Sequence, residues 1–301
     1  MQYIPVLTIA GSDSVGGAGI QADIKTISAL GCYAASAITA VTVQNTLGVK
    51  AVHAVPADIV EGQIRAVMDD IHPVAVKIGM VNDIATINAI ANALSDYIDE
   101  NSPKLAGHKD WKLNIVVVDP VMVSTSGSPL MRPDALAIFR QRLMPLATLL
   151  TPNMPEAEML SGISLSGEGK ELRASLDKAG KMIAQEASAA VLIKGGHITE
   201  GKQKNDYLYG KDGELINTFS AKAVATKNTH GTGCSLSSAI ASLMARGMSL
   251  TTAVTNAKEW ITEAIKAGAD VEIGEGNGPI NHFYEPHTMI KIAKVCQYSN
   301  T

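Results

Sequence analysis

The most informative segment of this 301-residue chain reads Ile115-Val116-Val117-Val118-Asp119-Pro120. Four β-branched residues in succession are typical of a strand buried on both faces, and the proline ends that strand at the aspartate. Further short apolar runs lie on either side of it along the chain, at residues 6–10, 36–44, 74–78, 149–151 and 190–194. These runs predict the strands of one buried sheet.

Longer segments with helical character separate the runs, at residues 17–30, 57–69, 82–97, 134–143, 171–187 and 237–246. This alternation favours an α/β fold with a central, mostly parallel sheet and helices on both faces. Because crossovers between parallel strands are almost always right-handed, an open, doubly wound sheet is expected. Residues 205–209 and 214–219 flank a Gly-Lys-Asp-Gly turn and predict a hairpin, whereas the polar residues 100–114 predict a surface excursion. We expect residues 1–301 to form a single domain.

The composition limits the classes of function. The formal net charge is −4 and there is no block of lysine or arginine, so neither a nucleic-acid partner nor a membrane partner is expected. The three cysteines, Cys32, Cys234 and Cys296, lack CxxC spacing, which argues against a disulfide framework or a structural zinc site. The N-terminus lacks the basic start of a signal peptide, and no apolar run is long enough to span a bilayer. A cytoplasmic protein is therefore expected.

Polar or glycine-rich segments follow the predicted strands, at residues 11–13, 44–45, 79–80, 119–120, 151–153 and 194–197. In open parallel sheets, ligands bind outside the carboxyl ends of the strands. These segments therefore predict one ligand site at that edge of the sheet.

The strongest motif reads Asn228-Thr229-His230-Gly231-Thr232-Gly233-Cys234-Ser235-Leu236 and leads into a predicted helix. Two glycines allow the backbone to curl closely around a ligand, and the N–H groups of a first helical turn attract phosphate. Gly231, Thr232 and Gly233 are thus a predicted anion hole. Alternatively, the glycines only make a tight turn into a core helix, which is the better interpretation of an isolated Gly-x-Gly.

Cys234 is placed by this motif in the first turn of the helix. A helix start and nearby positive charge lower the pKa of a thiol, so Cys234 is a candidate base for a hydroxyl proton or a candidate nucleophile. A nucleophile usually has a histidine partner, and His230 lies across the glycine turn, which favours the base. Cys32 and Cys296 are interpreted as small buried hydrophobic residues.

Five further residues would supply the charge neutralisation and the metal ion that phosphoryl transfer requires. Asp119 ends an apolar strand, where a carboxylate needs a cation or solvent. Asn153 and Glu156 can face one site from a helix start, and Glu156 is a candidate Mg²⁺ ligand through water. Alternatively, this pair is only a capping box. Lys194 and Lys227 are candidate contacts for ATP phosphates, or ordinary solvated lysines.

Jointly, the motifs resemble those of the hydroxymethylpyrimidine kinases of thiamine biosynthesis. The similarity runs in order from about residue 7 to residue 279 and is carried by residues 10–13, 16–23, 44–46, 77–80, 119–122, 151–157, 194–197 and 229–234. It implies a ribokinase-like fold and an enzyme that uses ATP and Mg²⁺ to phosphorylate a pyrimidine alcohol and then its monophosphate. It also implies a homodimer.

The resemblance assigns roles as well. Asp23 and Gln44 would hydrogen-bond the aminopyrimidine, because a carboxylate and an amide can pair with ring nitrogens and an exocyclic amine. Near the ring would lie Ala18, Met80 and Val121 or Met122. Cys234 would take the base position that an aspartate fills in many sugar kinases, and Asn153 with Glu156 matches the family's Mg²⁺-associated motif.

Two positions depart from the family pattern. Thr125 precedes Ser126-Gly127 where many members have a lysine, so a lid contact to phosphate is missing or supplied elsewhere. Ser14-Val15-Gly16 replaces a more polar sequence, which should alter a loop and leave the chemistry intact.

Three other functions fit parts of the sequence. A pyridoxal kinase comes first, since some family members phosphorylate that vitamin, but Gln44 favours the pyrimidine because pyridoxal-specific relatives tend to lack an amide there. A non-catalytic binding protein is disfavoured by the set Asp119, Glu156, Lys194 and Cys234. A Rossmann dehydrogenase is disfavoured because residues 36–44 contain no acidic residue to hold a ribose.

Overall fold

The computed structural model describes residues 1–105, 111–123, 130–196 and 203–293. Its strands are β1 (Gln2–Tyr3), β2 (Pro5–Ser12), β3 (Tyr33–Asn45), β4 (Gly48–Ala54), β5 (Ala75–Ile78), β6 (Ile115–Val118), β7 (Leu149–Leu150), β8 (Ala190–Lys194), β9 (Gln203–Tyr209), β10 (Leu215–Lys222) and β11 (Lys291–Ile292). Its α-helices are α1 (Gly19–Ala29), α2 (Ala57–Asp70), α3 (Ile84–Ile98), α4 (Leu136–Arg142), α5 (Met154–Ser161), α6 (Gly169–Ala187), α7 (Thr232–Ala245) and α8 (Leu250–Ala267). Short 3₁₀ turns are η1 (Pro103–Leu105), η2 (Pro133–Ala135) and η3 (Met144–Leu146).

The main sheet in the described part of the chain has nine strands in the order β10-β9-β8-β7-β6-β5-β2-β3-β4. Neighbouring strands from β3 through β2, β5, β6 and β7 to β8 are parallel. The outer strands β4, β9 and β10 pair antiparallel, so the predicted hairpin is confirmed. The predicted α/β fold with a mostly parallel sheet is also confirmed.

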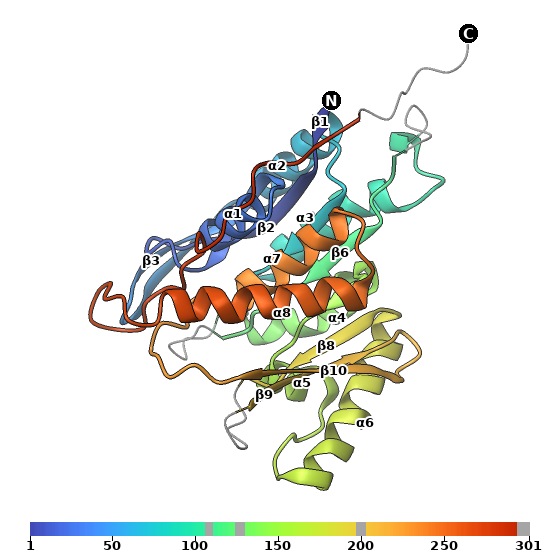
Figure 1. The fold of residues 1–301 in the computed structure, drawn as a ribbon. Coiled ribbons are helices and arrows are strands. Elements are labelled where there is room, and N and C mark those ends of the chain that lie inside the picture. The colour runs from blue at the N-terminus through green and yellow to red at the C-terminus, as the bar shows by residue number, and fades with distance from the viewer. Residues whose placement is uncertain (106–110, 124–129, 197–202, 294–301) are drawn as a thin grey trace.

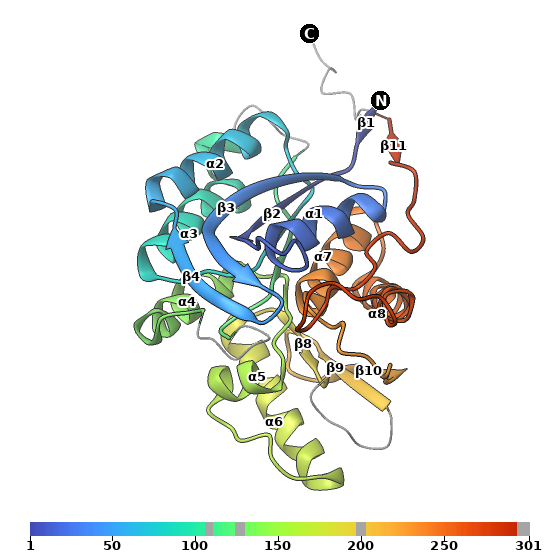
Figure 2. The ribbon, with the colours of Figure 1, turned by 90° about the vertical axis from the view of Figure 1, so that its left-hand side faces the viewer.

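The two faces of the sheet carry separate hydrophobic cores, and β6 shows how one strand serves both. Val116 and Val118 pack in a core with α2, α3, α4, α5 and α6, whereas Val117 packs on the opposite face with α1, α7 and α8. Because successive side chains of a strand point to opposite faces, an uninterrupted run of one isoleucine and three valines is what a doubly covered strand requires. Figures 1 and 2 show the helices on both sides of the sheet.

Helix α7 begins five residues earlier than the predicted start at 237, directly after the glycine turn. Gly231 is its N-terminal capping residue, with φ of 80°. A Cβ atom at this position would lie 1.8 Å from the carbonyl oxygen of Gly17, so both the backbone angle and the space require glycine. Cys234 therefore does lie in the first turn of the helix, as predicted.

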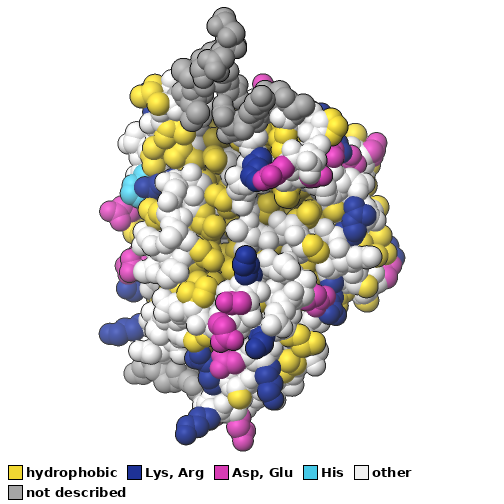
Figure 3. Space-filling model, turned by 90° about the vertical axis from the view of Figure 1, so that its right-hand side faces the viewer, with side chains coloured by type: hydrophobic (Ala, Val, Ile, Leu, Met, Phe, Trp, Pro, Cys, Tyr) yellow, Lys and Arg dark blue, Asp and Glu magenta, His cyan; other side chains and the backbone are white. Residues whose placement is uncertain are grey.

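Charged side chains of both signs are interspersed on the face of the molecule shown in Figure 3, with hydrophobic side chains between them. Among the helices that the structure describes, none combines the length and apolar character that crossing a membrane requires.

Candidate active site

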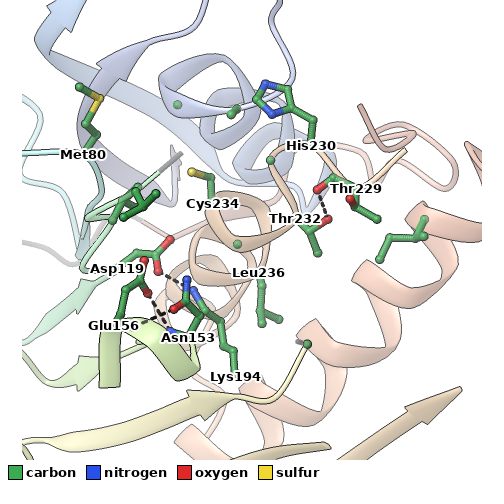
Figure 4. A pocket seen from close by; sticks show the side chains of 18 of the residues that line it. Met80, Asp119, Asn153, Glu156, Lys194, Thr229, His230, Thr232, Cys234 and Leu236 are labelled. Atoms are coloured by element: carbon green, nitrogen blue, oxygen red, sulfur yellow. Dashed lines mark hydrogen bonds and ion pairs between the residues drawn. The ribbon is translucent and has the colours of Figure 1, made fainter. Parts of the chain in front are cut away.

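A cavity of about 670 Å³ opens at the carboxyl ends of the parallel strands, where the sequence predicts a ligand site. Twelve of the predicted site residues line it, namely Ala18, Gln44, Met80, Asp119, Val121, Asn153, Glu156, Lys194, Gly231, Thr232, Gly233 and Cys234. Figure 4 shows Cys234 at the start of α7, with Asp119 and Lys194 on one side of it and His230 on the other. The chain thus brings together residues that are as much as 216 positions apart (18 to 234).

The start of α7 faces this cavity with unpaired backbone groups. Within an α-helix the first N–H groups have no intrahelical acceptor, and here these include the groups of Gly233 and Cys234. A Cβ atom on Gly233 would lie 3.4 Å from Nζ of Lys194 and 3.8 Å from Asp119, so the helix start and the charged pair adjoin. Backbone donors and a lysine at one point make a site for a phosphoryl group.

Lys194 and Asp119 form an ion pair in the wall of the cavity, with Nζ 2.7 Å from Oδ1. Thr151 also donates to Oδ1, and Ser237 of α7 donates to Oδ2. Burial alone would raise the pKa of Asp119, but the ammonium groups of Lys194 and Lys77 outweigh it and hold this pKa below its ordinary value. Asp119 therefore stays ionised, and Lys194 is the cation that a carboxylate at the end of a buried strand needs.

Glu156 and Asn153 form the capping box that the sequence left as an alternative. The Asn153 side chain accepts from the Glu156 amide at 2.9 Å, and the Glu156 carboxylate accepts from the Asn153 amide at 2.7 Å. Glu156 also lines the cavity. Burial raises the pKa of Glu156 to about 7, with Asp119 adding to the effect and Lys194 opposing it.

A divalent cation fits the two carboxyl groups of Asp119 and Glu156. Within the described ranges, no group of three or more His, Cys, Asp or Glu side chains is arranged to hold a metal ion. Mg²⁺ characteristically takes one or two carboxylates and completes its octahedron with water and substrate phosphates. Because Asp119 raises the pKa of Glu156, a cation between the two groups would relieve an unfavourable interaction.

The thiol of Cys234 has a raised pKa, contrary to the sequence-based prediction. Burial raises this pKa to about 11, with Asp23 and Asp119 adding to the effect, while Lys77 and the Gly19 amide oppose it. One side of Cys234 is open to the cavity, but protein surrounds the rest of the side chain. Desolvation therefore raises the pKa of the thiol by more than the helix start lowers it. At neutral pH the thiol is therefore protonated.

Asp23 lies behind the cavity wall and does not line it, so the expected direct contact with a pyrimidine is not supported. Its carboxylate is fully buried and accepts from Thr8 at 2.6 Å, from Ser238 at 2.7 Å and from Lys77 at 2.8 and 2.9 Å. Ser238 lies one turn beyond Cys234 on α7, so this polar cluster is beneath the thiol. Lys77, itself fully buried, is the cation that makes burial of Asp23 tolerable.

Lys227 is the other predicted residue outside the wall, since it is exposed on the loop before α7. The structure instead brings Lys258 of α8 to the cavity, paired with Asp206 of β9 at 2.5 Å. Asp206 also accepts from the amide of Gly195 at 3.0 Å. Lys258 was not among the predicted site residues, because no helix was predicted over the range of α8, although the apolar periodicity of that segment was an available signal.

Several sequence-based predictions lie outside the described residues. They concern Thr125-Ser126-Gly127, His197 and Cys296. Cys32 is buried as predicted, and burial raises the pKa of its thiol to about 11.

A doubly wound sheet whose edge holds backbone phosphate donors, a lysine–aspartate pair and a second carboxylate defines a phosphotransferase that acts on small molecules. More narrowly, the chain belongs to the phosphomethylpyrimidine kinase family, whose sequence profile matches residues 13–281. A hydroxymethylpyrimidine/phosphomethylpyrimidine kinase of Rhizobium meliloti is 46% identical over 278 residues, which are 92% of this chain and 96% of that protein.

Solved structures share the ribokinase-like fold. A phosphomethylpyrimidine kinase of Clostridium difficile has a TM-score of 0.69 and 43% identity, covering 87% of this chain and 99% of that one. A Bacillus subtilis pyridoxal kinase in complex with ADP has a TM-score of 0.79 and 31% identity, covering 93% and 98%. Overall shape therefore does not separate pyrimidine kinases from pyridoxal kinases.

Proposed function

We propose that this protein phosphorylates 4-amino-5-hydroxymethyl-2-methylpyrimidine with ATP and Mg²⁺, and then phosphorylates the monophosphate to the diphosphate for thiamine biosynthesis. The observation that carries the proposal is the composition of one continuous cavity. Gln44, Met80 and Val121 line its acceptor part, and the start of α7 with Asp119 and Lys194 lines the transfer point. The family relationship supplies the substrate class.

The chain's own residues act mainly by positioning and by charge, as phosphoryl transfer demands. The amides of Gly233 and Cys234 and the ammonium of Lys194 hold the transferred phosphoryl group between donor and acceptor. Asp119 and Glu156 would hold Mg²⁺, which would supply charge neutralisation on the ATP phosphates. Asp206 and Lys258 line the nucleotide part of the cavity.

The two phosphorylations make different demands on Cys234. The first acceptor is a hydroxymethyl group, which must lose its proton, and the thiolate form of Cys234 takes it. The second acceptor is a phosphate that is largely ionised near pH 7, because its second pKa is about 6, so it needs little help from a base. Only the first step therefore depends on the small thiolate population of a high-pKa thiol.

ATP consumption by the purified protein with Mg²⁺ tests the proposal, using hydroxymethylpyrimidine, its monophosphate and pyridoxal as separate acceptors. We expect turnover of both pyrimidines at a kcat/KM well above that for pyridoxal. A preference for pyridoxal would support the second candidate, which the similarity to the Bacillus subtilis pyridoxal kinase favours. Turnover of none of the three would show that the protein is a non-catalytic relative.

We also propose a homodimer that works in the cytoplasm without a nucleic-acid or membrane partner. The edge ribbon of β3 and β4 supports the dimer, since Val41, Val43 and Val52 are 47%, 58% and 40% exposed there. Exposed hydrophobic edge strands usually have a partner that covers them. Light scattering coupled to gel filtration tests the dimer, and replacing Val43 with lysine should yield monomers.

A further inference from the structure

We propose that Asp13 and His230 are positioning residues for phosphoryl transfer, because their contact joins two loops that meet at the cavity. The first is the glycine-rich loop of residues 13–19, and the second is the phosphate-binding turn of residues 229–234. Nε2 of His230 lies 2.9 Å from Oδ2 of Asp13, and the two side chains are only 7% and 4% exposed. The inference rests on the proposed kinase function.

Asp13 organises the glycine-rich loop from inside. Its Oδ2 accepts from the amides of Gly17 at 3.0 Å and Ala18 at 2.8 Å, and its Oδ1 accepts from Val15 at 3.0 Å. Backbone amides that converge in this way form a concave anion site, and here a carboxylate of the chain itself fills it. These amides are therefore not available to a phosphate, so the loop is not a second phosphate site.

Asp13 is ionised and is the acceptor in its contact with His230. Burial would raise the pKa of Asp13, but hydrogen bonds from His230 and from the amides of Ala18 and Val15 outweigh burial and hold this pKa below its ordinary value. An ionised carboxylate can only accept, so Nε2 of His230 carries a hydrogen and donates it to Asp13. Such a charge-assisted bond is about twice as strong as one between neutral groups.

The loop and the turn also touch at other points. A Cβ atom on Gly231 would lie 1.8 Å from the carbonyl oxygen of Gly17, so the two backbones are in direct contact. A Cβ atom on Gly17 would lie 2.7 Å from Cδ2 of His230, so the imidazole ring lies against the loop. At the end of the loop, the amide of Gly19 is close enough to Cys234 to lower the pKa of its thiol. The loop therefore contacts the turn along most of its length.

These contacts determine where the free amides of the turn point. Gly231 caps α7, and its carbonyl oxygen accepts from the amide of Ser235 at 2.9 Å. A displacement of Gly231 therefore moves the first turn of the helix, which contains the amides of Gly233 and Cys234. In the proposed function these amides hold the transferred phosphoryl group, and a misplacement of about 1 Å in such a group can cost about 100-fold in rate.

The turn has a different neighbour on each side. Figure 4 shows His230 on one side of Cys234, and Asp119 with Lys194 on the other. Lys194 supplies charge to the phosphoryl group directly. Nε2 of His230 gives its hydrogen to Asp13 and cannot also donate it to a phosphate. His230 therefore acts on the reaction through the position of the turn.

The experiment compares His230→Leu, which removes the hydrogen-bond donor, with His230→Gln, whose terminal N–H can reach the same carboxylate. Gly17→Ala is an independent perturbation, because its Cβ atom would displace the His230 ring, and residue 17 does not line the cavity. The matched control is Lys25→Met, since Nζ of Lys25 donates to the carbonyl oxygen of Gly16 at 2.7 Å and anchors the same loop to α1 instead of to the turn. Steady-state kinetics give kcat and KM for hydroxymethylpyrimidine, its monophosphate and ATP.

For His230→Leu we expect kcat to fall about 10- to 100-fold in both phosphorylations, because both use the same turn, with each KM within about threefold of the wild type. His230→Gln should keep kcat within about threefold, and Gly17→Ala should lower kcat about 10-fold in both steps. Lys25→Met should leave kcat within about twofold.

Four results would overturn the inference. A lower Tm without a lower kcat would show that the contact serves stability alone. A rise in one KM at unchanged kcat would show that His230 binds that substrate directly. A loss confined to the first phosphorylation would assign the effect to Cys234, and a Gln variant as impaired as the Leu variant would exclude the hydrogen bond to Asp13 as its cause.

Two further measurements keep the outcome decisive. If His230→Leu does not fold, Gly17→Ala carries the test, and an unchanged kcat contradicts the inference. If the wild type turns over no acceptor, the proposed function fails, but amide hydrogen exchange measured by mass spectrometry still decides whether the contact holds the turn. We then expect exchange at residues 229–235 to be about 10-fold faster in Gly17→Ala and His230→Leu than in the wild type. Equal exchange rates would refute the inference.

Discussion

Replacing Cys234 with alanine should damage the first phosphorylation far more than the second, and the difference should grow with pH. The thiol pKa is about 11, four units above pH 7, so only about one molecule in 10,000 carries the thiolate at neutral pH. Each added pH unit raises that population about tenfold. In the wild type, the rate of the first step should rise with the thiolate population. The alanine variant has no thiol to ionise, so its rate should not rise in this way.

General bases contribute about 100- to 10,000-fold to rate. We therefore expect a loss in first-step kcat/KM of about 100-fold at pH 7, growing to about 10,000-fold at pH 9, because two units multiply the thiolate population about 100-fold. The second step should lose less than about 10-fold at either pH, since its acceptor is already ionised above pH 7.

The assay separates the two products, the monophosphate and the diphosphate, by chromatography and starts each reaction from its own acceptor. Cys234→Ser is the matched control, because it keeps the shape of the helix start but carries a hydroxyl group that ionises far less readily than a thiol. Equal losses in both steps, or a loss that does not change between pH 7 and pH 9, would show that Cys234 acts through the shape of the anion hole.

Two other perturbations follow from the buried charges. Lys77→Met leaves the carboxylate of Asp23 buried without its cation and should lower the free energy of unfolding by about 3–5 kcal/mol in urea titrations. The double variant with Asp23→Leu should recover part of that loss, and no recovery would mean that packing, not charge, is responsible. The Mg²⁺ concentration for half-maximal activity should fall from pH 6 to pH 8, because Glu156 becomes ionised through its pKa of about 7 and can then bind the cation. Glu156→Gln should abolish this pH dependence, and a variant that keeps it would assign the titration to another group.

The strands and the position of the site could be predicted from the sequence, because local composition determines both. Val116, Val117 and Val118 predict a strand covered on both faces, and the polar residues after such strands necessarily meet at one edge of the sheet. Strand β4 was missed because it is an edge strand whose side chains are mostly exposed, so it lacks the alternation that marks a half-buried strand. Helix α8 carries a periodic apolar face, including Val254, Trp260 and Ile261, and could have been predicted.

Other features of the site depend on tertiary packing that no local pattern reports. The spacing of Asp23 in its motif gives no sign that Lys77, 54 residues away, turns the carboxylate inward. Likewise, the position of Cys234 at a helix start indicates a low thiol pKa, but the opposing desolvation comes from strands and loops distant in sequence. The contact between Asp13 and His230 joins two segments distant in sequence for the same reason.

The late position of α7 in the chain has a consequence for biosynthesis. Together with α8 it covers the face of the sheet to which Val6, Ala75 and Val117 contribute, although all three precede it by more than 100 residues. A ribosome adding about 5–20 residues per second needs about 2–8 s to extend the chain from residue 228 to residue 267. During that interval only α1 covers this face of the nascent sheet, and the apolar part that α7 and α8 later cover is where a chaperone that recognises hydrophobic segments would bind before the phosphate-binding helix closes over it.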